Sequence, residues 1–529
     1  MGLTLEGEDG PQTRLNDGLT PKRLLSGPVE NQPARAFRAT LIFELTYQDG
    51  FVRHPQQDDW QDSVVQATSG KCCYSLFTTL SVSDECTQEV TRGMTAMVLD
   101  GILPAERAVR SGPPHPLGND GSWRVYPRTE QEIRDLLTHA DREGLQVTVS
   151  GGGTKRGFGG QRKRYDLEIS LAEYKGVIEH RAGDLTMTVH AGTPIRELAE
   201  VLAAHGQMLP ADPRWPGSAT IGGVIAANDT GPKRLAYGAP RDFVIGVRAA
   251  TPDGRILRTG GKVVKNVAGY DMNKLWIGSM GTLGILLEVT VKLRPLPPDR
   301  GLLLIGFPAG AQGEIQTYVN RLQASSLEPV ALEVLNPSLS ARMAGWERDT
   351  LAIAFEDRPE AVTYQLERAE AERSGMTESV VMRGREAEDW WMRFAEITPD
   401  ATASIDPERP LISAKVALKN TDVAAFVGKA TEQAVQRKLE AFVHGGAGHG
   451  ISRVYVRGEQ EPVLHYLQVL RTFVEKRRGS LISDQMPLSW RKHFDVWGYQ
   501  RIPRSLMEGI KQSFDPNRTL NHQRYAGGI

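Results

Sequence analysis

The stretch SGGGTKRGFGG, Ser150 to Gly160, has the composition of a loop that binds an anion through its backbone. Six of its eleven residues are glycine, and such a loop exposes amide N–H groups with no side chains in the way. It is not a Walker loop, because no Gly-Lys-Ser/Thr occurs in the chain, and it is not a G-x-G-x-x-G site, because Arg156 and Arg162 stand where the last glycine would be. The stretch therefore predicts either a pyrophosphate-type anion site or a plain turn.

Two further stretches rich in small residues follow. LPADPRWPGSATIGGVIAANDTG, Leu209 to Gly231, predicts a helix that begins near Ala219, with Gly222 and Gly223 leaving its first amides accessible. GSMGTLG, Gly278 to Gly284, comes directly before an apolar run. Three such elements in this order indicate the walls of one site.

Regular elements flank these loops. Thr129 and Glu132 form a capping box, which predicts a helix that ends at Gly144 and leads into the strand before the first glycine loop. Alternation from Leu185 to Ala191 predicts a strand. Thr193-Pro194 then opens a helix that ends at Gly206, and Asp253-Gly254 predicts a hairpin. The inward residues of that second helix are expected to be Ile195, Leu198, Ala199 and Leu202.

The pattern changes after the proline-rich stretch Pro295 to Pro298. Strand-like runs such as GLLLIGF, LAIAF, LISAKVAL and RVYVRG alternate with long amphipathic helices such as EPVLHYLQVLRTFVEKRR. This predicts a second α+β domain of roughly 200 residues, followed by a short helix that Asp515-Pro516 stops.

The bulk properties exclude several classes of protein. The chain has 529 residues, a net charge of -1 and no dominant basic run, so we do not expect nucleic-acid binding. No apolar run of 18 or more uncharged residues is present, which predicts no membrane insertion and a cytoplasmic location, with any membrane association made peripherally through partners. The three cysteines, Cys72, Cys73 and Cys86, all precede residue 90, so the main body holds no iron–sulfur cluster.

The region from about Asn119 to Leu296 resembles the FAD-binding domain of the vanillyl-alcohol oxidase and p-cresol methylhydroxylase (PCMH) superfamily. The motifs GGGTK, PGSATIGGVIAAN, KNVAGYDMNKL and GSMGTLGIL carry this resemblance. Together with HFDVWG and IKQSFDPNRTLN they are similar, over roughly residues 122–525, to the FAD-binding subunit family of bacterial glycolate oxidase. The resemblance implies an α+β protein with a two-subdomain PCMH-type FAD-binding domain at 118–297. An α+β cap domain with an antiparallel sheet would follow at 299–500, and then a C-terminal segment, 501–529, that returns to the flavin domain.

The resemblance also implies where FAD is bound. Ser150 to Thr154 would wrap the diphosphate, Pro216 to Gly223 would line the diphosphate and the flavin ring, and Gly281 to Ile285 would meet the adenine end. The expected cofactor residues are Ser150, Gly151, Gly152, Gly153, Thr154, Pro216, Gly217, Ser218, Ala219, Thr220, Ile221, Gly222, Gly223, Ala226, Asn228, Gly281, Gly284, Ile285 and Asn521.

Other family positions receive structural roles. Lys265, Gly269, Tyr270 and Asp271 are marked positions of the family, and we expect Tyr270 to be a packed aromatic and Asp271 a helix cap. Superfamily members often attach FAD through a histidine in or near the first loop. SGGGTKRGFGG contains none, so we expect non-covalent FAD.

The groups that act on a substrate are harder to find. Oxidation of a 2-hydroxy acid needs a base near the hydroxyl and a cation for the carboxylate. Related enzymes carry a metal motif H-x-G-D-G-N-x-H, but HGGAGHG, His444 to Gly450, has Ala447 and His449 in place of the Asp and Asn. We therefore predict no metal site and a glycine-rich turn before RVYVRG, and the catalytic residues stay unknown, with His444 and His522 as candidates. Trp390, Trp391 and Trp497 either line a pocket or pack a domain interface.

The resemblance implies an FAD-dependent oxidoreductase subunit of a glycolate oxidase-like complex, which oxidises small D-2-hydroxy acids to 2-oxo acids. Its expected partners are a larger flavin subunit and an iron–sulfur subunit. Two alternatives stay open, a flavin-bearing structural or electron-relay subunit and a self-sufficient flavin oxidase of another alcohol. Residues 1–93 match nothing in the family, and we expect them to be a mis-assigned start or a disordered N-terminal extension.

Overall fold

The computed structural model describes residues 101–261, 270–373, 378–403, 405–498 and 503–529, together with five strand segments nearer the N-terminus. The chain divides into two compact units, Met1–Val98 and Leu99–Ile529. The boundary falls five residues after the predicted end of the extension at residue 93.

The N-terminal unit contains one antiparallel sheet with strand order β2-β1-β3-β5-β4. Its strands are β1 (Gly2–Glu6), β2 (Thr13–Leu15), β3 (Arg38–Glu44), β4 (Val64–Ala67) and β5 (Tyr74–Ser81). All other residues of the interval 1–93, including the three cysteines, lie outside the described residues. The expectation of a mis-assigned or disordered extension therefore stays a prediction.

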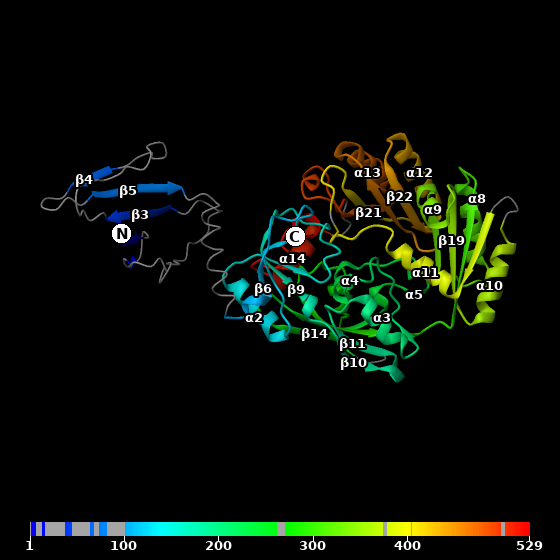
Figure 1. Ribbon diagram of the computed structural model, residues 1–529, viewed down its shortest axis with the longest axis horizontal. Helices are drawn as coiled ribbons and strands as arrows, with labels where there is room; N and C mark the ends of the chain where they lie inside the picture. Colours follow the sequence, from blue (N-terminus) through cyan, green and yellow to red (C-terminus); the bar gives the residue numbers. More distant parts are fainter. Residues whose placement is uncertain are drawn as a thin grey trace. The chain divides into compact units, whose positions relative to one another are not determined.

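The larger unit begins with a small sheet of order β6-β7-β9-β8 (Figure 1). Its strands are β6 (Ala108–Arg110), β7 (Gly121–Val125), β8 (Val147–Ser150) and β9 (Tyr165–Ser170), and β7 and β8 both run parallel to β9. The predicted capping box of Thr129 and Glu132 is confirmed at the start of α2 (Glu130–Arg142). This helix delivers the chain to β8, and β8 ends at the first residue of the glycine loop.

A second sheet, of order β10-β11-β15-β13-β14, is antiparallel throughout. It consists of β10 (Val177–Arg181), β11 (Thr186–His190), β13 (Val244–Ala250), β14 (Ile256–Gly260) and β15 (Ile285–Lys292). The hairpin predicted at Asp253-Gly254 is confirmed between β13 and β14, and Gly254 has a φ of +78°.

The helices of this domain are short. They are α3 (Ile195–Ala203), α4 (Ile221–Ala227), α5 (Arg234–Tyr237), α6 (Pro240–Phe243) and α7 (Asn273–Trp276), and the short strands β12 (Gln207–Met208) and β16 (Arg294–Pro295) pair with each other. Helix α3 buries Ile195, Leu198 and Leu202 as predicted, but Ala199 is exposed. The prediction for Ala199 was wrong because the buried stripe of this helix is narrower than the apolar pattern.

The cap domain is built on an eight-stranded antiparallel sheet of order β20-β17-β19-β18-β22-β23-β21-β24. Its strands are β17 (Asp299–Phe307), β18 (Ala331–Leu335), β19 (Asp349–Asp357), β20 (Glu378–Arg383), β21 (Leu411–Ala417), β22 (Glu440–Gly446), β23 (Ile451–Arg457) and β24 (Ser480–Gln485). Its helices are α8 (Gln312–Ala324), α9 (Pro337–Ala344), α10 (Pro359–Ala371), α11 (Gly384–Ala395), α12 (Val423–Gln436) and α13 (Gln460–Glu475).

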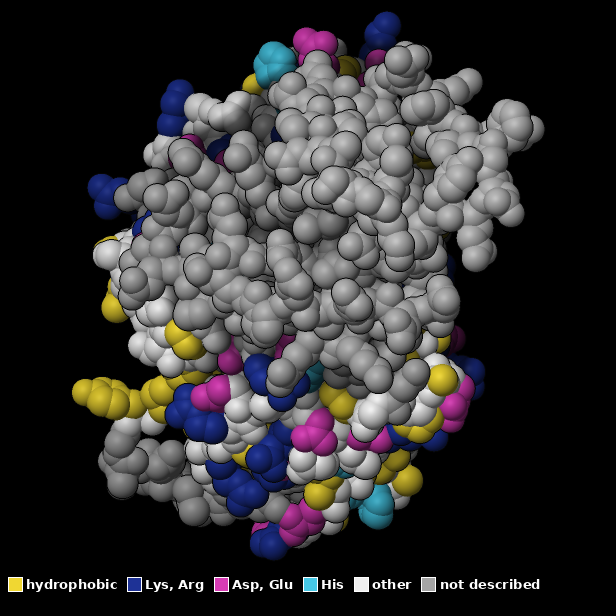
Figure 2. All heavy atoms as spheres, turned by 90° about the vertical axis from the view of Figure 1, so that its left-hand side faces the viewer, with side chains coloured by type: hydrophobic (Ala, Val, Ile, Leu, Met, Phe, Trp, Pro, Cys, Tyr) yellow, Lys and Arg dark blue, Asp and Glu magenta, His cyan; other side chains and the backbone are white. Residues whose placement is uncertain are grey.

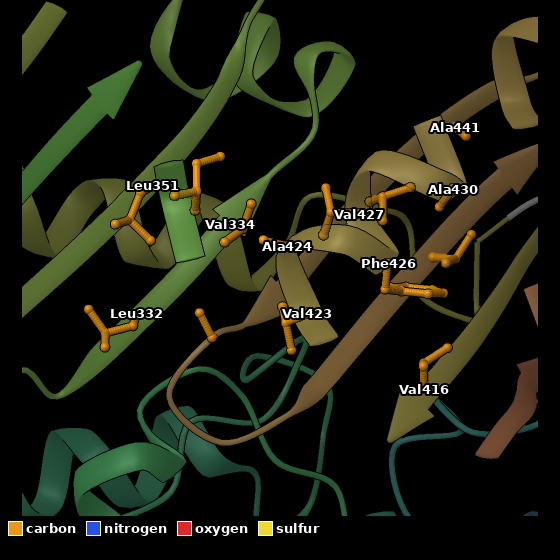
Figure 3. Close-up of a cluster of buried hydrophobic side chains, with 14 of the residues drawn as sticks. Leu332, Val334, Leu351, Val416, Val423, Ala424, Phe426, Val427, Ala430 and Ala441 are labelled. Atoms are coloured by element: carbon orange, nitrogen blue, oxygen red, sulfur yellow. The ribbon is translucent and has the colours of Figure 1, made fainter. Parts of the chain in front are cut away.

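Both faces of the cap sheet are buried. Leu303 and Ile305 of β17 belong to one apolar cluster, and Leu302 and Leu304 belong to another, because successive side chains of a strand point to opposite faces. Figure 3 shows part of the first cluster, where side chains of α12 pack against strands of the sheet. Trp390 and Trp391 of α11 pack in the second cluster, so these two side chains serve packing.

The C-terminal segment returns to the small sheet. After α14 (Arg504–Phe514), Leu520 forms a parallel bridge with Val147 of β8, and the backbone N–H of Asn521 donates to the Val147 carbonyl at 2.8 Å. Lys511 of α14 is buried and donates to the carbonyls of Thr282 and Leu520 at 2.7 and 2.8 Å. The segment is therefore tied both to β8 and to the loop before β15.

Short 3-10 helices complete the architecture: η2 (Ala105–Arg107), η3 (Leu171–Glu173), η4 (Ala182–Asp184), η5 (Asn420–Asp422), η6 (Trp490–Lys492) and η7 (Ala526–Gly528). Within the described parts of the chain, no helix has the length and apolar character needed to cross a membrane. In the view of Figure 2 the described basic and acidic side chains are interspersed, in keeping with the net charge of -1.

Candidate cofactor site

A cavity opens where the glycine loop, α4, the loop before β15 and the C-terminal segment meet. It holds about 790 Å³ of space free of protein atoms, part of it open to solvent. Many of the expected cofactor residues line it, namely Ser150, Gly151, Gly152, Gly153, Thr154, Thr220, Gly222, Gly223, Ala226, Gly281, Gly284, Ile285 and Asn521.

Other expected residues lie beside the cavity without lining it: Pro216, Gly217, Ser218, Ala219, Ile221 and Asn228. The sequence reasoning missed several lining residues. Lys155 and Arg156 directly follow GGGT, and Met280 lies inside GSMGTLG, so the motifs could have indicated them. Asn119 and Arg524 also line the cavity, but no local pattern marks either residue.

The glycine loop is held very close to the loop before α4. A Cβ at Gly152 would lie 1.6 Å from the Ser218 carbonyl oxygen, and a Cβ at Gly151 would lie 2.1 Å from the Thr220 hydroxyl. A Cβ at Gly222 would meet Ala191 at 2.6 Å. These glycines are therefore required for the close packing of the protein itself. Gly223 differs, because its Cβ would meet only the Thr220 hydroxyl, at 3.1 Å.

A buried carboxylate fixes the glycine loop from behind. Glu168 of β9 accepts from the Ser150 hydroxyl at 2.8 Å and from the guanidinium of Arg156 at 2.6 Å. Burial alone would raise the pKa of Glu168, but the charges of Arg156 and Arg124 and the Ser150 hydroxyl lower it. The loop therefore keeps its shape through its first residue and through Arg156.

Asn521 fixes the opposite wall. Its side-chain oxygen accepts from the Thr148 hydroxyl at 2.8 Å, and its amide group donates to the Met280 carbonyl at 2.8 Å and to the Gly281 carbonyl at 3.3 Å. Met280 and Gly281 both have positive φ, +55° and +67°. The side chain of Asn521 therefore positions the loop before β15 against β8.

The charges around the cavity favour an anionic ligand. Lys155, Arg156 and Arg524 line it, and none of the described lining residues is Asp or Glu. Backbone amides of glycine-rich loops combined with cations form a suitable environment for a pyrophosphate. The residues present thus fit the diphosphate and the flat rings of FAD.

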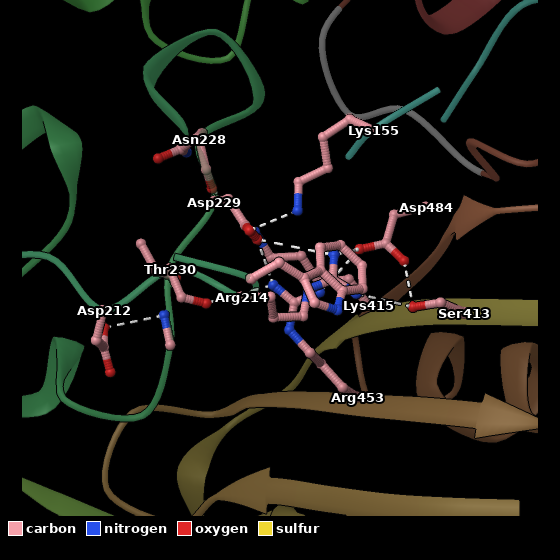
Figure 4. A network of polar contacts seen from close by, with 12 residues as sticks. Lys155, Asp212, Arg214, Asn228, Asp229, Thr230, Ser413, Lys415, Arg453 and Asp484 are labelled. Carbon is pink, nitrogen blue, oxygen red and sulfur yellow. Dashed lines mark hydrogen bonds and ion pairs between the residues drawn. The ribbon is translucent and has the colours of Figure 1, made fainter. Parts of the chain in front are cut away.

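A buried ionic network lies between the FAD-binding domain and the cap sheet, and we call it the interdomain network (Figure 4). Asp229 accepts from Lys155 at 2.6 Å and from Arg453 at 2.6 Å. Asp484 of β24 accepts from Arg453 at 2.8 Å, from Arg214 at 2.5 Å and from the Ser413 hydroxyl at 2.6 Å. Lys155 belongs both to this network and to the cavity lining, so the network borders the cavity.

Burial and neighbouring charges shift the pKa values in this network. Although burial would raise the pKa of Asp229, the charges of Lys155, Arg453 and Arg214 hold it well below its usual value. Burial, reinforced by the charge of Arg214, lowers the pKa of Lys155 to about 8. Burial and the charge of Arg453 lower the pKa of Lys415, on β21, to about 8 as well.

The two candidate bases lie away from the cavity lining. His444 is buried in β22, where its Nδ1 is 2.8 Å from Glu333, and burial lowers its pKa. His522 is half-buried near Arg162 and Arg518, and burial lowers its pKa to about 4. Neither histidine is among the described lining residues.

The HGGAGHG stretch joins two strands of the cap sheet. Residues 447–450 form the turn between β22 and β23, whereas His444 lies in the strand before it. The sequence missed Glu333, which lies within hydrogen-bonding distance of His444 and 3.6 Å from His449. Within the described residues, no group of three or more His, Cys, Asp and Glu side chains has a geometry that could hold a metal ion.

The structure corrects the role predicted for Tyr270 and shows where several other predicted residues lie. Tyr270 is 92% exposed, so the expectation that it is a packed aromatic was wrong. Asp271 accepts from the backbone N–H of Asn273 at 3.2 Å at the start of α7 and pairs with Lys274. Trp497 stacks on Phe158 of the glycine loop, which places it where the cap meets the FAD-binding domain. Lys265 and Gly269 lie outside the described residues.

Comparisons with known proteins agree with this geometry. A family model described as an FAD binding domain matches residues 122–260. Glycolate oxidase subunit GlcD of Bacillus subtilis (strain 168) is 31% identical over 414 residues, which cover 75% of this chain and 87% of that protein. Glycolate oxidase subunit GlcE of Escherichia coli (strain K12) is 36% identical over 168 residues, which cover 32% of this chain and 47% of that protein.

A solved structure agrees in fold. The crystal structure of p-cresol methylhydroxylase with bound substrate superimposes with a TM-score of 0.67 and 14% sequence identity, and covers 82% of this chain and 96% of that chain. At this identity the likeness is one of fold alone. The predicted fold class, a PCMH-type domain followed by an α+β cap with an antiparallel sheet, is confirmed.

The interdomain network predicts a large effect for Asp229→Asn. Removing one buried charge leaves Lys155 without its carboxylate and leaves Arg453 with Asp484 alone, which should lower the free energy of unfolding by about 3–5 kcal/mol. The matched control is Asp389→Asn, because Asp389 is 50% exposed and pairs with the exposed Arg385, and its loss should cost about 0–1 kcal/mol. Denaturant unfolding followed by circular dichroism measures both, and equal losses would contradict the prediction.

Asp229→Asn and the wild type should also differ in how the free energy of unfolding depends on pH. Because the folded-state pKa of Asp229 lies below its unfolded value of about 3.9, its contribution to stability is present above that pH and is lost as the pH falls. Asp229→Asn should therefore lose less stability than the wild type between neutral and acidic pH.

Proposed function

This chain belongs to the family of FAD-linked oxidoreductases that includes glycolate oxidase subunit GlcD, and from that premise we propose that it holds FAD non-covalently in the cavity described above. We further propose that it oxidises small D-2-hydroxy acids to 2-oxo acids as a subunit of a glycolate oxidase-like complex.

The observation that carries the proposal is the lining of the cavity. The glycine loop predicted to wrap a diphosphate, the start of α4 and the loop before β15 surround one space, with cations and without carboxylates among the described lining residues. No described lining residue is histidine, cysteine or tyrosine, the side chains that could bond covalently to a flavin, which supports non-covalent attachment.

The chemistry divides between the cofactor and the chain. Bound FAD would accept the hydride that leaves C2 of the hydroxy acid. Ser150 to Thr154 would hold the diphosphate, Thr220 to Gly223 would continue that wall, and Gly281 to Ile285 would meet the adenine end. Lys155 connects the cavity lining to the interdomain network and so to Arg453 of the cap sheet.

Partners would supply the remaining functions. All three cysteines lie before residue 99, so electrons would pass onward through an iron–sulfur subunit, and a larger flavin subunit would complete the complex. The names of two relatives, subunits of glycolate oxidase, support a multi-subunit assembly.

Non-covalent attachment predicts that acid precipitation releases all the yellow chromophore into the supernatant. The physical reason is that unfolding removes every amide and cation that holds the cofactor, and no bond to a side chain would remain. Absorbance of the supernatant and of the redissolved pellet measures this. Colour that stays with the pellet would contradict the prediction.

The cavity assignment predicts that Gly223→Val lowers FAD occupancy while the protein stays folded. Gly223 lines the cavity, and a Cβ there would meet only the Thr220 hydroxyl, at 3.1 Å, so a larger side chain would take up space at the cavity wall. The control is Gly183→Val, because a Cβ there would meet nothing within 4 Å. The ratio of flavin to protein absorbance should fall severalfold in Gly223→Val alone. Full FAD occupancy in that variant would contradict the assignment of the cavity as the FAD site.

The subunit proposal predicts that the isolated chain binds FAD yet reduces it slowly with glycolate or D-lactate. Fast transfer needs the substrate held close to the cofactor, and positioning of this kind supplies much of the rate. Anaerobic bleaching of the flavin is measured first for the chain alone and then with sister subunits added. Rapid, complete bleaching of the isolated chain would instead favour a self-sufficient oxidase.

A further inference from the structure

Six consecutive carbonyl groups of the glycine loop, those of residues 155–160, accept hydrogen bonds from donors outside the loop. The donors come from Asn119, from Arg524 of the C-terminal segment, and from a stretch of the cap domain that follows β24. We call this stretch, residues 486–497, the clasp segment. Because protein donors pair with all six carbonyl oxygens, their partial negative charge is offset, which favours an anion in the cavity beside them.

The clasp segment supplies donors for the last residues of the loop. The backbone N–H of Met486 donates to the Gly157 carbonyl at 3.2 Å. The guanidinium of Arg491 donates to the Gly160 carbonyl at 2.9 Å and also to the Gly159 carbonyl. The second half of the glycine loop is therefore fastened to the cap domain, whereas the first half is fastened within its own domain.

Two buried guanidinium groups hold this half of the loop. Arg491 is 3% exposed, and its other hydrogen bonds go to the carbonyls of Met486 and Leu117. Arg524 is buried as well, and no carboxylate of the described residues forms an ion pair with either guanidinium. Burial, reinforced by the charge of Arg524, lowers the pKa of Arg491 to about 9. A buried charge without a counter-charge is costly, so the two cations favour an anion beside the loop.

A stack of three aromatic rings adds a second connection. Trp497, in the motif HFDVWG, stacks on Phe158 of the glycine loop with ring centres 4.7 Å apart. The ring of Tyr525 in the C-terminal segment lies 4.9 Å from that of Trp497. Asp495 accepts from the backbone N–H of Trp497 at 3.0 Å and so fixes the turn that presents the indole. The stack therefore joins the glycine loop, the cap domain and the C-terminal segment.

The clasp segment restrains the part of the loop that carries two cations of the cavity wall. Lys155 and Arg156 belong to this part, and both line the cavity. Their carbonyls accept from Arg524 at 3.0 Å and from Asn119 at 2.7 Å, respectively. The clasp segment holds the residues that follow, so the placement of both cations depends on contacts with the cap domain.

We propose that the clasp segment retains FAD by holding the second half of the glycine loop in place, with Trp497 and Arg491 as positioning residues for the cofactor. Neither residue is among the described residues that line the cavity, so each acts through the loop. This inference rests on the proposed function and adds to it a role for the cap domain, which must keep its contacts with the loop for FAD to stay bound.

The rate at which FAD leaves the full-length chain tests the proposal. FAD released after dilution is separated by rapid filtration and measured by absorbance, for variants whose circular dichroism matches the wild type. Trp497→Ala should raise the dissociation rate by about 10-fold, because both ring contacts are lost. Trp497→Phe should restore most of the slow dissociation, because a ring still stacks on Phe158.

The matched control is Tyr237→Leu. Tyr237 of α5 also joins the FAD-binding domain to the cap, since its hydroxyl donates to Glu356 of β19, but it does not contact the glycine loop. This variant should release FAD at the wild-type rate. Equal rates in Trp497→Ala and wild type would overturn the proposal. So would release that is as fast in Tyr237→Leu or Trp497→Phe as in Trp497→Ala.

Hydrogen exchange of the wild type covers the case in which Trp497→Ala fails to fold. Added FAD should slow amide exchange in residues 155–160 and in the clasp segment together and leave α10 unchanged, as read by peptide mass spectrometry. Slower exchange in the loop without any change in the clasp segment would overturn the proposal.

Wild-type protein that binds no FAD would contradict the proposed function instead. Exchange of residues 155–160 without FAD, compared between wild type and Arg491→Lys, would then decide the role of the clasp segment. Faster exchange in Arg491→Lys is expected, because an ammonium group cannot reproduce the planar set of donors that the guanidinium offers. Equal exchange would overturn the proposal.

Discussion

The relative position of the cofactor domain and the cap sheet depends on two buried carboxylates. Asp229 follows α4 and Asp484 lies in β24, and Arg453 of β23 donates to both of them. Arg214, from the loop before α4, reaches across to Asp484 in the same way. Each carboxylate therefore pairs with one cation of its own domain and with one cation of the other domain. A small displacement would leave a charge buried and unpaired at a cost of several kcal/mol, so the network restricts the domains to one arrangement more than it adds stability.

A second constraint acts inside the cofactor domain. The glycine loop approaches the loop before α4 so closely that the carbonyl of Ser218 fills the place of a Cβ at Gly152. The glycines thus do two things, because Gly151 and Gly152 let two loops of the protein meet, whereas Gly223 leaves the cavity open. Glu168 then holds the first loop from the side opposite the cavity. The cavity wall is consequently stiff before any ligand is present.

Sequence patterns predicted the features that depend on residues close together in the chain. The capping box of Thr129 and Glu132 and the hairpin at Asp253-Gly254 are local signals, and the structure contains both. The motifs around the glycine loop also predicted the fold, through the family that they resemble. The interdomain network escaped detection because its members come from distant segments, and an aspartate such as Asp484 has no local feature that distinguishes it from a surface acid. Glu333 was missed for the same reason, since its partner His444 lies 111 residues away.

The two lysines of the network show how the cofactor site and the cap are linked electrostatically. Both have a pKa of about 8, lowered chiefly by burial, although Lys155 already contacts Asp229. The charges of Asp229 and Asp484 raise the pKa of both lysines, so burial and the neighbouring arginines outweigh the two carboxylates. Because Lys155 lines the cavity and Lys415 lies on the cap sheet, a negative charge on either side is felt on the other.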